Sequence, residues 1–254
     1  LVWRRPMAPG DDGVLGNGRI SSRWPVRGGP VIRDGVLYVA AGIWPSEGIT
    51  VQALDPATGR TLWENDSAGY TEMDQPHPTA RAKSGISAQG YLTVSGDTLL
   101  VPTGRATPAA LSLADGALRY FRLQEYSGRG AGPFISAVGE WYFSELDAFR
   151  LGDGRRFSRG IPSQAMAATP GMIVHVVPTG IAGTPPSQIY VEQDGFDRRG
   201  SPIKQYVAGK PAWSVDWPGP RGCSLIAAGN TAVMGVPGSA PKGAGRVVLI
   251  DTTS

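Results

Sequence analysis

Six residues in loop-like segments have side chains suited to binding a ligand. Four are arginine or lysine, one is a histidine between two prolines, and one is a tryptophan. Guanidinium and ammonium groups attract anions and an indole ring offers a flat wall, so together they favour a small anionic or planar ligand. The other interpretation is that they are solvated loop residues. The six candidates are Trp44, His77, Arg81, Lys83, Arg105 and Arg129.

No catalytic residue is predicted, because the common catalytic motifs are missing. The segment at residues 85–90, GISAQG, misses the G-x-S-x-G nucleophile motif by one residue and has no strand-to-helix pattern around it. The glycines at residues 128–132 do not have the spacing of a phosphate-binding or dinucleotide-binding loop. The two histidines and the single cysteine, Cys223, are far apart in the sequence, so no metal site is predicted.

The composition favours many short strands joined by turns. The 254 residues include 36 glycines and 22 prolines, which is above ordinary usage. The formal net charge of +3 is small, and the lysines and arginines are scattered singly, so nucleic-acid binding is not indicated. No apolar run approaches the roughly 18 residues of a membrane-spanning helix, so no transmembrane segment is predicted.

The elements that must position these loops are short β-strands in a repeating unit, which is best preserved at residues 29–63. This segment holds β-rich runs and tight turns at Asp34-Gly35 and Thr58-Gly59. One unit of about 35 to 45 residues cannot bury both of its faces alone, so further copies must stack against it. The copies have second strands that begin near residues 36, 98, 141, 172 and 231, and this interval of about 50 residues is typical of propeller blades.

The last two copies are the least regular. In the fourth, strands are expected at residues 166–168, 172–177, 188–191 and 212–215, with an insertion between the last two. In the fifth, strands are expected at residues 224–227, 231–236 and 246–250. The fourth strand of that copy would come either from residues beyond this sequence or from residues 1–3, which resemble the closing strand of a preceding unit.

The sequence thus predicts an all-β fold, a β-propeller of four-stranded antiparallel blades with about five blades in a single domain over residues 1–254. Strands of a blade alternate in direction, so second-to-third strand loops and connections between blades emerge on one face. The turns on the opposite face are minimal. The loops on the first face are long, at residues 42–48, 64–90, 102–108, 122–132 and 178–185, and they hold all six candidates.

Residues 53–63, ALDPATGRTLW, fit the A-x-D-x-x-T-G-x-x-x-W signature of the pyrroloquinoline-quinone (PQQ) type β-propeller repeat at every signature position. The sequence therefore resembles quinoprotein-like repeat proteins, including uncharacterised bacterial ones. We expect it to be a fragment of a seven- or eight-bladed propeller, truncated at both ends. The signature is structural: Asp55 and Thr58 bond turn backbone, Gly59 supplies a positive φ, and Trp63 wedges between blades.

The resemblance implies two classes of function. One is a non-catalytic scaffold that binds a protein, or the small ligand above, through the face with long loops, like propeller scaffolds of the bacterial cell envelope. The other is a quinoprotein dehydrogenase-like enzyme that uses PQQ and calcium to oxidise an alcohol or sugar. Such enzymes commonly carry adjacent cysteines and a set of calcium ligands, and neither maps onto this sequence. The scaffold without a cofactor is therefore favoured, and the same analogy implies an exported, periplasmic protein.

Overall fold

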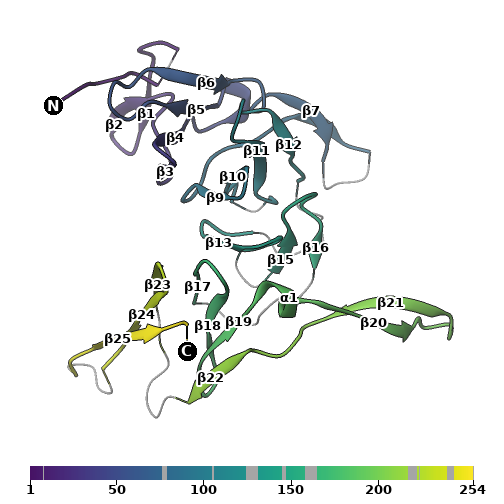
Figure 1. The fold of residues 1–254 in the computed structure, drawn as a ribbon. Helices are drawn as coiled ribbons and strands as arrows, with labels where there is room; N and C mark the ends of the chain where they lie inside the picture. The colour runs from purple at the N-terminus through teal and green to yellow at the C-terminus, as the bar shows by residue number, and fades with distance from the viewer. Residues whose placement is uncertain are drawn as a thin grey trace. The chain divides into compact units, whose positions relative to one another are not determined.

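The computed structural model describes residues 1–7, 9–75, 79–104, 106–123, 131–144, 147–157, 165–216, 222, 224–238 and 243–253. Within these ranges, helical structure is confined to one turn of α-helix, α1 (Pro186–Ile189), and one 3-10 turn, η1 (Pro45–Glu47). The strands form antiparallel sheets, four of which have four strands each (Figure 1). The all-β prediction is therefore confirmed. The chain divides into two compact units, Leu1–Ile135 and Ser136–Ser254, which are described separately.

The first unit contains two four-stranded sheets, in which each strand pairs with the next one along the chain. We call them blade 1 and blade 2. Blade 1 consists of β3 (Val31–Arg33), β4 (Val36–Ala41), β5 (Thr50–Leu54) and β6 (Thr61–Asn65). Blade 2 consists of β9 (Thr93–Ser95), β10 (Thr98–Val101), β11 (Ala109–Ser112) and β12 (Leu118–Tyr120). Two further hairpins, which the sequence did not predict, are β1 (Gly13–Gly16) with β2 (Arg19–Ser22), and β7 (Thr71–Asp74) with β8 (Arg81–Ser84).

The second unit contains three further blades, which we call blades 3 to 5, and one two-stranded hairpin that is described below. Blade 3 consists of β13 (Ile135–Val138), which begins one residue before the unit boundary, β14 (Trp141–Ser144), β15 (Asp147–Arg150) and β16 (Arg156–Phe157). Blade 4 consists of β17 (Met166–Ala168), β18 (Ile173–Val177), β19 (Gly180–Thr184) and β22 (Trp213–Asp216). Blade 5 has three described strands, β23 (Ser224–Ala228), β24 (Thr231–Val236) and β25 (Arg246–Asp251).

The third strand of blade 4 was predicted wrongly. It is β19 rather than residues 188–191, and a two-residue turn joins it to β18, so the long loop predicted at residues 178–185 is not there either. The segment GIAGT was predicted to be a loop because its residues are small. That smallness is a packing requirement, since a Cβ at Gly183 would collide with the ring of Trp213 on the neighbouring strand.

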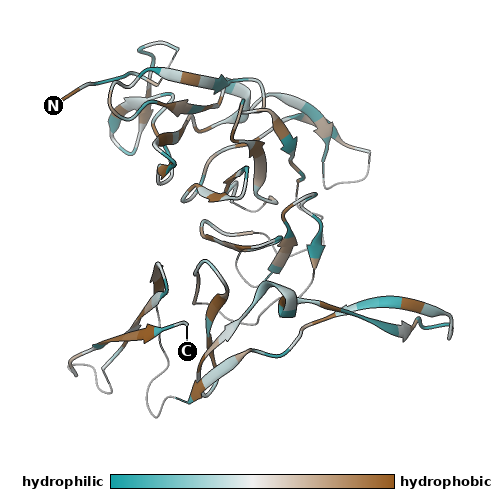
Figure 2. Cartoon of the chain, viewed as in Figure 1, coloured by the Kyte–Doolittle hydropathy of each residue, from teal (hydrophilic) through white to brown (hydrophobic). Residues whose placement is uncertain are grey.

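The insertion in blade 4 folds as α1 followed by a hairpin of β20 (Val191–Phe196) and β21 (Pro202–Val207). It connects the third strand of the blade to the fourth, and Figure 1 shows the hairpin projecting away from β18 and β19. Figure 2 shows that the hairpin is mostly hydrophilic. The insertion predicted between the last two strands of blade 4 is therefore confirmed.

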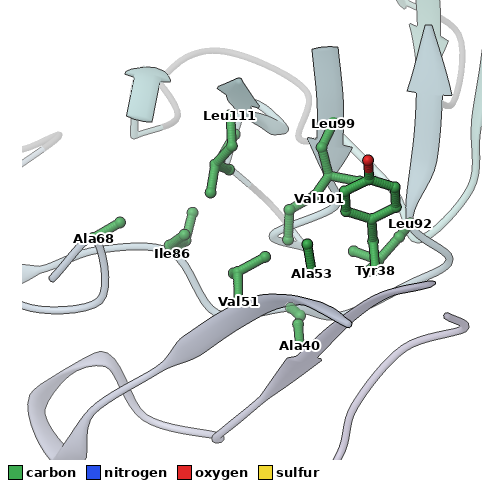
Figure 3. Packing of buried hydrophobic residues seen from close by; sticks show 12 residues of the cluster. Tyr38, Ala40, Val51, Ala53, Ala68, Ile86, Leu92, Leu99, Val101 and Leu111 are labelled. Atoms are coloured by element: carbon green, nitrogen blue, oxygen red, sulfur yellow. The ribbon is translucent and has the colours of Figure 1, made fainter. Parts of the chain in front are cut away.

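Buried side chains gather between successive blades. In the first unit, Tyr38, Val51 and Ala53 of blade 1 pack with Leu99 and Leu111 of blade 2 in one hydrophobic cluster (Figure 3). In the second unit, one cluster joins blades 3 and 4 and another joins blades 4 and 5. Sheets that bury each other's faces in series are the architecture of propeller blades, which explains why one blade could not fold alone.

Trp63 on β6 links blade 1 to blade 2. Its indole Nε1 donates a hydrogen bond of 2.8 Å to the backbone oxygen of Leu113 in blade 2. A Cβ at Gly116 would collide with the Trp63 ring, and the φ of +72° at Gly116 also favours glycine. The ring is therefore held by both a hydrogen bond and close packing.

The signature turn of blade 1 is held by its own side chains. Asp55 Oδ1 accepts a hydrogen bond of 2.8 Å from the Ala57 backbone N–H, and Gly59 has a φ of +72°. The Ala57 hydrogen bond is the largest of the effects that lower the pKa of the Asp55 carboxyl below its usual value. Trp3 lies on this turn as Trp63 lies on the turn of blade 2: its Nε1 donates to Pro56 O at 2.8 Å, and its ring leaves no room for a Cβ at Gly59.

Candidate functional site

Trp44 lies in the connection between β4 and β5, which is a second-to-third strand loop as predicted. It is the residue before η1, in an extended conformation, and 47% of its surface is exposed. The loop around it is anchored, because Ser87 Oγ donates a hydrogen bond of 2.6 Å to the Ile43 carbonyl. A large aromatic side chain is thus held in solvent by an ordered loop.

Arg81 and Lys83 both lie on β8, two residues apart, so they share one face of the β7–β8 hairpin. The register places Asp74 opposite Arg81 and Glu72 opposite Lys83. Arg81 Nε lies 3.4 Å from Asp74 Oδ1, with both side chains well exposed, so this ion pair contributes little to stability. The two cations face two carboxylates, and this part of the surface is of mixed charge rather than cationic.

Lys83 makes its own contact with an aromatic residue. Its Nζ donates a hydrogen bond of 2.7 Å to the hydroxyl of Tyr70 and lies 4.2 Å from the centre of the Tyr70 ring. Tyr70 is 48% exposed. Strand β8 also contacts η1, so Trp44, Tyr70 and Lys83 lie on adjoining elements, and we call these three residues the loop surface. Sequence reasoning missed Tyr70, although an aromatic residue in a long polar connection was an available signal.

The other predicted site residues lie outside the described residues. These are His77, Arg105 and Arg129. Among the residues that are described, no group of three or more histidine, cysteine, aspartate or glutamate side chains is arranged to hold a metal ion. We derive no chemistry through a quinone cofactor.

No helix in the described part of the chain is long and apolar enough to cross a membrane.

The blades are four-stranded antiparallel sheets that pack face to face, and a tryptophan of blade 1 lies on the turn of blade 2. This arrangement defines a β-propeller repeat protein. The model of the PQQ_2 family, described as outer membrane protein assembly factor BamB, matches residues 1–130. That is more than half of the chain, and the protein belongs to this family.

Solved structures that this chain matches include BamB from Moraxella catarrhalis, at 15% identity and a TM-score of 0.40, covering 83% of this chain and 56% of that chain. This chain therefore spans little more than half of that BamB. The computationally designed protein Ika4 matches at 14% identity and a TM-score of 0.38, covering 65% of this chain and 96% of its own. The computationally designed protein Ika8 matches at 11% identity and a TM-score of 0.37, covering 91% of this chain and 72% of its own. No curated protein matches this sequence.

Proposed function

We propose that this protein is a non-catalytic propeller scaffold that binds a protein partner through the loop surface. The observation that carries the proposal is the exposure of Trp44 and Tyr70 on adjoining elements, with the Lys83 ammonium against the Tyr70 ring. Tryptophan and tyrosine are the residues most enriched among those that dominate protein interfaces. They lose little conformational entropy on binding when their loops are already ordered, as the loop of Trp44 is.

The mixed charge of the neighbouring hairpin favours a protein over a small anion. Arg81 is already paired with Asp74. Among the described residues, no carboxylate lies within ion-pair distance of Lys83. One exposed lysine is a weak anion site, whereas alternating charges beside two aromatic residues are typical of a protein interface with its polar rim. The family description supports a role in outer membrane protein assembly, with the chain exported to the periplasm. No observation favours the quinoprotein alternative.

Removing both aromatic side chains of the loop surface is expected to release the partner. The double variant Trp44→Ala/Tyr70→Ala should lower recovery of the partner at least about tenfold, because two central aromatic contacts each contribute on the order of 1 to 2 kcal/mol. Recovery is measured by quantitative mass spectrometry after purification of the full-length protein from its own cells.

The matched control is Leu15→Ala/Ile20→Ala. These two exposed residues, 81% and 80% accessible, form a cross-strand pair on the β1–β2 hairpin of the same unit. The control should recover the partner as the unaltered protein does. If the loop-surface variant recovers the partner as well as the unaltered protein does, the proposal is refuted. Equal loss in the loop-surface variant and the control would also refute it, since that would indicate a general effect of removing apolar surface.

A further inference from the structure

A cleft of about 400 Å³ lies in the first unit, between blade 1 and the segment that precedes it. One side is formed by Arg5 and Met7 together with Trp24. The other side is formed by Thr50 and Gln52 of β5 with Glu64 of β6, and Asp66 follows at the end of that strand. The three described candidates from the sequence, Trp44, Arg81 and Lys83, do not line it.

The Glu64 carboxylate is fixed in orientation without being neutralised. The Thr50 hydroxyl and the Gln52 amide nitrogen each donate a hydrogen bond of 2.8 Å to the same oxygen, Glu64 Oε1. Both donors are uncharged. The second oxygen, Oε2, has neither a hydrogen bond nor an ion pair within the part of the chain that the structure describes. A charged acceptor is thus held in place at the cleft.

Gln52 also has an acceptor that no described residue satisfies. The residue is only 3% exposed, and its amide oxygen Oε1 has no hydrogen-bond partner among the residues that the structure describes. A buried polar atom without a partner is costly, so such atoms are rare unless a ligand or water supplies the missing bond. Because Gln52 lines the cleft, a group with several N–H donors could serve this oxygen and Glu64 together after a small rotation of the amide.

The charge and the wall of the cleft select a planar cation. Asp66 has no ion-pair or hydrogen-bond partner among the described residues, so two carboxylates face one cation of the lining, Arg5. The Arg5 guanidinium is directed to the Gly59 carbonyl at 3.5 Å and pairs with neither carboxylate. The Trp24 indole is held by a hydrogen bond of 2.7 Å from its Nε1 to Glu47 O, and an indole face attracts guanidinium groups.

We propose that this cleft binds the guanidinium group of an arginine side chain. A guanidinium is flat, carries five N–H donors in a fixed fork, and stacks on aromatic rings while it bonds a carboxylate. These properties match Trp24, the free oxygen of Glu64 and the unpartnered oxygen of Gln52. The inference goes beyond the proposed function and does not rest on it, because the site and its ligand can be tested without any partner protein.

The test is a titration of the purified protein with N-acetyl-L-arginine amide, followed by the NMR signal of the Trp24 indole N–H. We expect saturable binding to the unaltered protein. Binding should weaken at least about tenfold with Glu64→Gln, which keeps the shape of the side chain and removes its charge. Asp66→Asn, which lies outside the hydrogen-bonded network of Glu64, should also weaken binding. The matched control is Glu72→Gln, on the exposed β7–β8 hairpin, which should bind as the unaltered protein does.

Two comparison ligands define the chemistry. N-acetyl-L-citrulline amide has the same shape without the charge and should bind at least about tenfold more weakly. N-acetyl-L-lysine amide has the charge without the planar fork and should also bind more weakly. The proposal is overturned if arginine amide does not saturate, if citrulline or lysine amide binds equally well, or if neither Glu64→Gln nor Asp66→Asn weakens binding. These results do not depend on partner recovery by the loop-surface variant, so the failure of one proposal can be distinguished from the failure of the other.

Discussion

Replacing Trp63 with alanine is expected to lower the free energy of unfolding of the first unit by about 3 to 5 kcal/mol. The substitution removes a large ring that fills the space between blades 1 and 2, and it removes the hydrogen bond from the indole Nε1 to Leu113 O. It also leaves a cavity over Gly116, whose lack of a side chain is matched to the ring. The measurement is chemical denaturation followed by far-ultraviolet circular dichroism.

The control for Trp63 is its neighbour on the same strand. Leu62 is 43% exposed, so Leu62→Ala should change the free energy of unfolding by no more than about 0.5 kcal/mol. Gly116→Ala gives an independent test of the same contact, because the added Cβ must displace the Trp63 ring. The two substitutions disrupt one contact, so their effects should not add in the double variant. An unchanged denaturation midpoint for Trp63→Ala would show that the ring does not join the blades.

The second large effect is a loss of stability in mild acid that originates in blade 4. His175 on β18 is 5% exposed, and its Nε2 lies 3.1 Å from Thr184 Oγ1, while its Nδ1 has no partner among the described residues. Burial lowers the pKa of His175 from its usual 6.5 to about 4. The unfolded chain therefore takes up the proton more readily than the folded chain, so protonation favours unfolding.

Above about pH 6.5 His175 is neutral in both the folded and the unfolded chain, and the free energy of unfolding is unaffected by its titration. As the pH falls from about 6.5 to about 4, the unfolded chain takes up the proton first, so the free energy of unfolding decreases. At about 1.4 kcal/mol for each pKa unit, the total loss is roughly 3 kcal/mol. Denaturation midpoints measured between pH 7 and pH 4 should show the decline. His175→Gln, which can still bond Thr184 but does not titrate, should flatten it. The matched control is His77→Gln, at the only other histidine of the sequence, and it should keep the decline. A decline that His175→Gln leaves unchanged would assign it to other groups.

Blade 1 was predictable from the sequence because its signals are local. The Asp55 side chain bonds the backbone two residues ahead, and Gly59 has the positive φ that its turn requires, so neighbouring residues determine the turn. Strand β19 was missed because its reason is not local: Gly183 is in a strand that accommodates the Trp213 ring from 30 residues further along the chain. A run of small residues predicts a loop unless the contact with Trp213 is known.

The site was predictable only in part. The placement of Trp44 in a second-to-third strand loop was correct, because its position between two recognisable strands identifies a loop, and the Ser87–Ile43 hydrogen bond anchors that loop. The β7–β8 hairpin was missed because the sequences TEMD and RAKS lack alternating apolar residues. Its pairing places opposite charges across the two strands, and that pairing brings Lys83 to Tyr70. The cleft of Glu64 could not be predicted, because its walls come from segments about 25 to 60 residues apart.

The most direct test of the central claim is site-specific photo-crosslinking of the full-length protein in its own cells. A photo-reactive amino acid is placed at Trp44 or at Tyr70, which are 47% and 48% exposed, or as a control at Leu15 on the β1–β2 hairpin, which is 81% exposed. If the loop surface binds a partner, positions 44 and 70 form adducts with one and the same protein, and position 15 does not. Adducts of equal yield and identity at all three positions, or no adduct at positions 44 and 70, would contradict the scaffold function proposed for this surface.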